Sequence, residues 1–336
     1  MINCLYFVSN VIIVKIRARY AKRLTQIDYD NLVTCKKVSE VASYLKNKQA
    51  YRESLLNVDD KNIRRSFLES VLNQNFFEDL AVLAKYDLTF GREIFRYILK
   101  KFEIRQISRF LIFLKSGDVS KFECSFPKFL KSKSKIKFDN FNKAKSYNDL
   151  LNFVYKTEYY DILKSNINKN LDFDINKIET ELYNNIFSMF FDVINKLNSK
   201  IREKIKKFLY SCVDVSNAIR ITRAKKFYNS DDNFISDITF NFGDYKFSKY
   251  DFLKNSNFSN FSLFGDNINS VRELEKFLKV MRFNWSKKNI RYSIISEVVG
   301  FSYVFLKEIE ISNVINIIEG VRYGISKEKI RQLLIL

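Results

Sequence analysis

Few residues in this 336-residue sequence have the type and spacing that catalytic chemistry requires. The chain contains no histidine, which excludes a histidine general base, a Ser–His–Asp triad and a histidine metal ligand. No G-x-x-x-x-G-K-[S/T] segment occurs, which excludes a nucleotide-binding P-loop. The sequence therefore predicts a protein that has no catalytic residues, no metal site and no cofactor.

Carboxylates and thiols are the remaining groups that could do chemistry, and their spacing argues against it. Glu308 and Glu310 are two residues apart, so a helix would place them on different sides. A pair of carboxylates assembled from distant segments remains an alternative. The cysteines are too far apart in sequence for a metal knuckle or a CxxC redox pair, and we expect free thiols. They are Cys4, Cys35, Cys124 and Cys212.

The composition favours an all-α protein. Seven Gly and one Pro are few for a sheet protein or a nucleotide-binding α/β fold, which need many turn residues. The net charge of +20 would attract nucleic acid or an anionic membrane. Compositional drift explains the charge as well, because Lys, Asn, Ile, Phe and Tyr are all abundant. No stretch reaches the roughly 18 apolar residues of a membrane span, so we expect no transmembrane segment.

A repeated pattern indicates where helices lie. VSNVIIVKIR, VSNAIRITRAK and ISNVINIIEGVR each place a β-branched residue, Ser and Asn before a helical pattern, and a weaker copy has Gln106 at the Asn position. Ser and Asn beside a helix start are usually caps. We therefore expect each asparagine to cap or to fix a helix, as a structural residue, with direct partner contact as the alternative. The three are Asn10, Asn217 and Asn313.

A second pattern, acid, aliphatic, two variable residues, aromatic, aliphatic, begins at Glu40, Asp149 and Glu273. Ser146 and Ser270 precede the last two acids at capping-box spacing, whereas the first copy has Lys37 at the cap position. A Thr or Ser that follows an apolar residue marks further helix starts. These are Thr25, Ser248 and Ser326.

The distances between these patterns predict three homologous helical modules. The span from Glu40 to Gln106 nearly equals that from Asp149 to Asn217, and the third copy is shorter. We place the modules at residues 1–112, 113–226 and 227–336. Because the first and last Asn helices fall outside complete modules, we expect the N-terminal helix to pack with the third module.

These segments resemble the C subunit of bacterial and archaeal V-type ATPases, which is subunit d in the eukaryotic enzyme. The segment LKEIEISNVINIIEGVRYGISKEKIRQLL, Leu306 to Leu334, is similar to the closing motif of that family. The opening segment from Val14 to Leu45 and DVSNAIRITRAK, Asp214 to Lys225, are similar to its opening and middle motifs. The resemblance covers essentially the whole chain, although Ile16 and Glu319 stand where the middle copy has Arg223.

The resemblance implies three similar helical subdomains arranged as a funnel with pseudo-threefold symmetry. It implies a non-catalytic rotor subunit, peripheral at the cytoplasmic face of the membrane. Its partners would be the central-stalk subunits of the soluble ATPase head and the membrane proteolipid ring. Basic residues near the repeated helices could steer the chain to acidic partner surfaces. These candidate interface residues are Arg17, Arg19, Arg223 and Arg322.

Two other functions fit parts of the sequence. Interleaved lysines and aromatic residues from Tyr147 to Tyr160 could bind single-stranded nucleic acid by stacking, in a basic helical nucleic-acid-binding protein. Those aromatics fall at apolar helical positions, however, where core packing is the usual reason, so we expect no nucleic-acid partner. The basic segment from Lys15 to Arg23 could instead bind a lipid surface.

Overall fold

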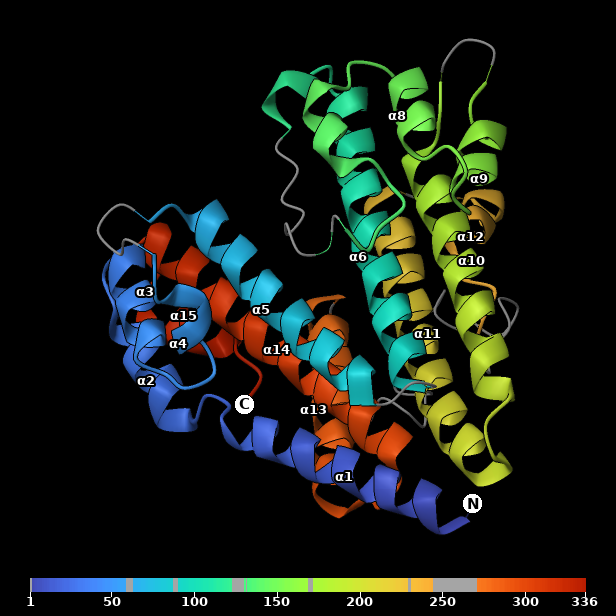
Figure 1. Cartoon of the computed structure of the whole chain (residues 1–336). Coiled ribbons are helices and arrows are strands. Elements are labelled where there is room, and N and C mark those ends of the chain that lie inside the picture. The colour runs from blue at the N-terminus through green and yellow to red at the C-terminus, as the bar shows by residue number, and fades with distance from the viewer. Residues whose placement is uncertain are drawn as a thin grey trace. The chain divides into compact units, whose positions relative to one another are not determined.

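The computed structural model describes residues 2–58, 63–86, 90–122, 130, 132–168, 172–228, 231–243 and 271–336. Within these ranges every regular element is a helix, so the all-α prediction is confirmed (Figure 1). None of the helices described is both long and apolar enough to span a membrane. Internal contacts divide the chain into two compact units. Unit 1 comprises residues 1–95, 125–132 and 283–336, and unit 2 comprises residues 96–124 and 133–282.

Unit 1 is built around one long helix near the end of the chain, α14. This helix packs against α1, α5, α3 and α15, so both ends of the sequence contribute to one core. Ile16 of α1 meets Val299 and Tyr303 of α14 in that core. The elements of unit 1 are α1 (Ile2–Ala21), α2 (Gln26–Thr34), α3 (Val38–Lys46), α4 (Arg52–Leu55), α5 (Arg65–Tyr86), the start of α6 (Phe90–Lys115), the end of α13 (Val271–Tyr292), α14 (Ser296–Arg322) and α15 (Lys327–Leu333).

A glycine in α14 permits the close packing of the last helix. A Cβ atom at Gly320 would lie 2.5 Å from the Ile330 side chain of α15, which is closer than two carbon atoms can approach. Gly324 then ends the helical path with a positive φ of 62°, a conformation that glycine adopts without strain. The chain can therefore reverse after Arg322 and lay α15 directly on α14.

Unit 2 is built around two long helices, α10 and α11, which pack together and against α12. Val215 and Ile221 of α11, Ile235 of α12 and Leu274 of α13 share one buried cluster. The elements of unit 2 are the rest of α6, the 3₁₀ helices η1 (Val119–Lys121) and η2 (Phe138–Lys143), α8 (Tyr147–Phe153), α9 (Tyr160–Ser165), α10 (Ile175–Asn195), α11 (Ser199–Tyr228), α12 (Asp232–Ile238) and the start of α13.

Several helix starts lie where the local sequence predicts them. Thr25 and Ser146 each form a complete capping box with the acid three residues later, which is Asp28 or Asp149. Lys37 makes no side-chain cap, and Ser326 precedes α15 without a cap hydrogen bond. The predicted helix starts at Ser248 and Ser270 lie outside the described residues.

The helices follow the same order in the two spans of nearly equal length. Between residues 40 and 106, the short helices α3 and α4 precede the long helices α5 and α6. Between residues 149 and 217, the short helices α8 and α9 precede the long helices α10 and α11. This order agrees with a repeated module. The division into three modules, the funnel and the pseudo-threefold symmetry stay predictions.

The expected helix starts at the three repeated asparagines are wrong. Asn10 lies within α1, Asn217 within α11 and Asn313 within α14. The helices continue through them because the preceding residues, such as Leu209 and Val213 in α11, are also buried at helical spacing. None of the three asparagines therefore caps a helix.

Candidate functional site

Two of the repeated asparagines make the same contact. The Asn217 amide donates to the Phe240 carbonyl over 3.0 Å, and its oxygen accepts from the Phe240 N–H over 2.9 Å. Asn313 exchanges the same two bonds with Ile335, at 2.7 and 3.0 Å. Each partner lies two residues beyond the end of a short helix, α12 or α15. Asn217 and Asn313 therefore hold the segment after the short helix against the long helix.

A buried carboxylate precedes each buried amide by three residues, on the same face of its helix. The pairs are Glu103 with Gln106 in α6, Asp214 with Asn217 in α11, and Glu310 with Asn313 in α14. Reasoning from the sequence singled out the amides and gave no role to the acids. The recurring acid-x-x-amide spacing was the signal that could have found them.

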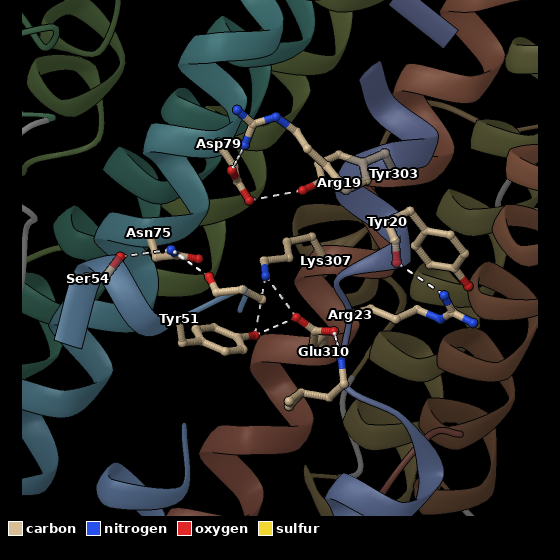
Figure 2. A network of polar contacts seen from close by, with 12 residues as sticks. Arg19, Tyr20, Arg23, Tyr51, Ser54, Asn75, Asp79, Tyr303, Lys307 and Glu310 are labelled. Atoms are coloured by element: carbon tan, nitrogen blue, oxygen red, sulfur yellow. Dashed lines mark hydrogen bonds and ion pairs between the residues drawn. The ribbon is translucent and has the colours of Figure 1, made fainter. Parts of the chain in front are cut away.

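Glu310 lies at the centre of a buried polar network in unit 1 (Figure 2). One carboxylate oxygen accepts from the Tyr51 hydroxyl over 2.5 Å and from the Lys307 ammonium over 2.8 Å. The other accepts from the Leu24 N–H over 2.9 Å. Burial and the neighbouring Glu310 carboxylate raise the pKa of Tyr51 well above its usual value. The network ties the α1–α2 loop and the residue before α4 to α14.

Glu103 has an equivalent partner in unit 2. The Tyr159 hydroxyl donates to it over 2.6 Å, and Ser134 donates to its other oxygen. Burial raises the pKa of Glu103, although these hydrogen bonds and the charge of Lys100 act in the opposite direction. Tyr51 and Tyr159 thus perform the same task, each joining the segment after a short helix to a carboxylate on a long one.

Arg17 contacts the end of α13. Its guanidinium donates to the carbonyls of Ile290, Arg291 and Ser293 at distances of 2.9 to 3.0 Å. Carbonyls at a helix C-terminus lack partners within the helix, so this side chain satisfies groups that would otherwise need water. The structure therefore gives Arg17 an internal role.

The other candidate arginines differ in exposure. Arg19 pairs with Asp79, which also accepts from the Tyr303 hydroxyl over 3.0 Å (Figure 2). Arg223 pairs with Glu275, and both side chains are exposed. Arg322 is exposed, and its guanidinium lies 5.3 Å from the centre of the Tyr323 ring. The predicted residues do not form one site, and their part in an interface stays a prediction.

A cavity of about 650 Å³ lies within unit 1, beside the Glu310 network. Its walls come from α1, α2, α4, α5, α13 and α14, together with residues of the connecting loops. Two carboxylates at this cavity, Glu310 and Asp79, are paired with Lys307 and Arg19. Among the described residues there is no group of three or more acidic or cysteine side chains that could hold a metal ion. The arrangement can bind charged groups but does not resemble an acid–base pair.

Comparison with known proteins assigns the chain to a family. The family model of the ATP synthase (C/AC39) subunit matches residues 12–333, which is nearly the whole sequence. A comparison with curated protein sequences finds no match. The match includes the Asn217 contact, Asn313 and the Glu310 network. Ile335, which Asn313 binds, lies just beyond the match, as does Leu336 of the cavity wall. The chain therefore belongs to the V-type ATP synthase (C/AC39) subunit family.

Proposed function

We propose that this chain is a non-catalytic central-stalk subunit of a V-type ATPase or ATP synthase. It seats the stalk on the membrane proteolipid ring and couples ATP turnover to ion transport. The single observation that carries the proposal is the family match over residues 12–333. The subunit acts as a peripheral protein at the cytoplasmic face of the membrane and does no chemistry itself.

A coupling subunit must hold two partners while torque passes through it, so it needs rigid elements. Helix α14, with 27 residues, spans about 40 Å. It is tied to distant parts of unit 1 through Glu310 and Asn313. Buried hydrogen bonds between segments that are far apart in sequence oppose local unfolding. These contacts support a role in which the chain transmits force.

Each of the two interfaces must also resist slipping. We expect each to bury about 1,200 Å² or more in total, the size of a stable protein–protein interface. Exposed cations such as Arg322 would raise the rate of association with acidic partner surfaces more than the affinity. Arg17 is a poor candidate for this role because its guanidinium is committed to the α13 carbonyls.

The test is deletion of the gene, followed by assays on washed membranes and on the soluble fraction. The catalytic head should assemble without attaching to the membrane, so that ATP hydrolysis continues in the soluble fraction while ion pumping stops. A plasmid copy of the gene should restore pumping, which controls for effects on neighbouring genes. If membranes that lack the protein still pump ions when ATP is added, the coupling role is wrong.

The nucleic-acid alternative loses part of the feature that suggested it. Tyr147 and Tyr159 are buried, and their hydroxyls bind the Leu163 carbonyl and Glu103. Neither ring can stack on a base, although Tyr155 between them is exposed. No observation in the described structure favours this second function.

A further inference from the structure

The cavity in unit 1 has the size of a small-molecule site. Its volume of about 650 Å³ falls within the range of roughly 300 to 1,000 Å³ that is typical of ligand pockets. Part of its lining is apolar, including Leu306 and Ile309 of α14 and Ile335 after α15. An organic group could therefore be buried there.

The charged groups at the cavity do not balance. Four basic side chains line it without an ion pair to any carboxylate among the described residues: Lys22, Arg23, Lys287 and Arg291. Glu53 is the one side-chain carboxylate in the described lining that has no such pair, because Asp79 and Glu310 already bind Arg19 and Lys307. Uncompensated positive charge around a concave surface attracts anions.

The cations come from two elements that are held together. Lys287 and Arg291 are four residues apart and share one face of α13, and Lys22 and Arg23 follow directly after α1. The Arg17 hydrogen bonds join α1 to the end of α13. Burial raises the pKa of Tyr20, whereas the charges of Arg23 and Arg291 lower it, so both guanidiniums act on one phenol. Arg23 and Arg291 therefore lie near one phenol, and the contact between α1 and α13 holds the backbones that carry the four cations in place before any ligand binds, which reduces the entropy cost of binding.

We propose that this cavity binds an organic anion that carries two or more phosphate groups. The phosphates would contact Lys22, Arg23, Lys287 and Arg291, and the organic part would pack on Leu306 and Ile309. Phosphate suits the site because the planar guanidinium of arginine binds two phosphate oxygens at once. The volume of the cavity suits a small molecule or a lipid headgroup better than a peptide. The inference does not depend on the proposed coupling role.

The experiment uses the purified full-length chain and isothermal titration calorimetry at physiological salt. The first probe is inositol hexakisphosphate, an organic polyphosphate, and we expect saturable binding of one molecule per chain. The second arm measures sedimentation with phosphatidylcholine vesicles that contain phosphatidylinositol bisphosphate, a lipid whose headgroup carries several phosphates. Binding of both probes, with the soluble one displacing the vesicles, assigns the site to lipid phosphate. Binding of the soluble probe alone assigns it to a free phosphorylated molecule.

Matched variants separate this site from general attraction to a basic protein. The test variant combines Lys22→Gln with Lys287→Gln, and the control combines Lys288→Gln with Lys329→Gln. Both remove two charges from unit 1, but Lys288 and Lys329 do not line the cavity. The test variant should bind about tenfold more weakly or worse, because charge-assisted hydrogen bonds are lost. The control should stay within about twofold, because exposed charges outside the cavity are screened by salt.

Three results would overturn the proposal. One is the absence of saturable binding by the wild-type chain. Another is an equal loss of affinity in the test and control variants, since that would reflect net charge alone. The third is binding of an acidic peptide in place of the phosphorylated probes. Each of these results leaves the gene-deletion assay unaffected, so the coupling role and the anion site can fail separately.

Discussion

The Tyr51 hydroxyl donates a hydrogen bond of 2.5 Å to the carboxylate of Glu310, 259 residues further along the chain. The contact is buried and is shared with Lys307, whose ammonium lies 4.4 Å from the centre of the Tyr51 ring. Tyr159 and Glu103 repeat it in unit 2. Both units thus use a phenol and a carboxylate to join a short-helix region to a long helix.

Replacing Tyr51 with Phe should destabilise the protein by about 1 to 3 kcal/mol. The substitution keeps the ring but leaves a buried carboxylate with one hydrogen-bond donor fewer. The matched control is Tyr323→Phe, because the Tyr323 side chain is 66% exposed, and it should change the free energy of unfolding by about 0.5 kcal/mol or less. Urea unfolding followed by circular dichroism measures both. Equal effects of the two changes would show that the Tyr51 contact adds no stability.

The three repeated asparagines provide their own control series. Asn217→Ala and Asn313→Ala should each lower the free energy of unfolding by about 2 to 3 kcal/mol. Each removes two hydrogen bonds and leaves a backbone N–H and C=O without that partner, partly buried at Phe240 and buried at Ile335. Asn10→Ala alters an exposed position and should cost about 0.5 kcal/mol or less. Thermal and urea unfolding provide the comparison. If Asn217→Ala kept full stability yet abolished assembly with the ATPase, direct partner contact would be the correct interpretation.

The sequence predicted the features that depend on neighbouring residues. Capping boxes at Thr25 and Ser146 follow from residues three positions apart, and helical periodicity with few turn residues predicted the all-α class. The same capping preferences gave a wrong helix start at Asn217 and Asn313. A Ser–Asn pair resembles a helix start, but these asparagines hydrogen-bond to segments 22 and 23 residues away, inside helices that continue.

The hydrogen-bond partners of the charged residues could not be predicted, because most of them lie far away in the sequence. Lys307 and Glu310 are three residues apart and could be paired from the sequence, whereas Tyr51 and Leu24 join them from more than 250 residues away. The partners of Arg17 could not be predicted for the same reason, because the carbonyls that it binds lie at the end of α13, some 273 residues later. A basic residue on a helix was therefore a weak guide to an interface.

The stability contributed by Asp28 should depend on pH. Burial raises the pKa of Asp28, but hydrogen bonds from Lys48, Thr25 and Tyr44 lower it to about 2, below the usual value of 3.8. Because the folded-state pKa is the lower one, the ionised carboxylate stabilises the fold fully above about pH 4. That contribution is lost as the pH falls toward about 2.

The Asp28→Asn variant tests this dependence. It should be less stable than wild type by about 2 kcal/mol at neutral pH, the scale of hydrogen bonds to a charged group. The difference should shrink as the pH is lowered from about 4 to about 2, in urea unfolding at a series of pH values. Asp30→Asn is the control, since Asp30 forms an exposed pair with Arg331 and should contribute about 1 kcal/mol or less. A difference that stayed constant down to about pH 2 would contradict the lowered pKa.

The candidate arginines should separate into a structural and an interfacial residue. Arg17→Gln should cost about 2 to 3 kcal/mol of stability, because it leaves the carbonyls of Ile290 and Ser293 without their charged donor at the end of α13. Arg322→Gln should leave the free energy of unfolding within about 0.5 kcal/mol of wild type, because the side chain is exposed.

The rate of assembly with the ATPase should be more sensitive to Arg322→Gln than to Arg17→Gln, the reverse of the effects on stability. If Arg322 steers the subunit toward an acidic surface, Arg322→Gln should slow association with the rest of the ATPase and weaken the dependence of the rate on salt. Arg17→Gln should leave the association rate unchanged under conditions in which the variant is folded. Unfolding in urea and stopped-flow association at several salt concentrations measure the two effects independently. If Arg322→Gln associates at the wild-type rate and with the wild-type salt dependence, Arg322 does not lie at the interface. If folded Arg17→Gln associates more slowly than wild type, Arg17 has a role beyond supporting α13.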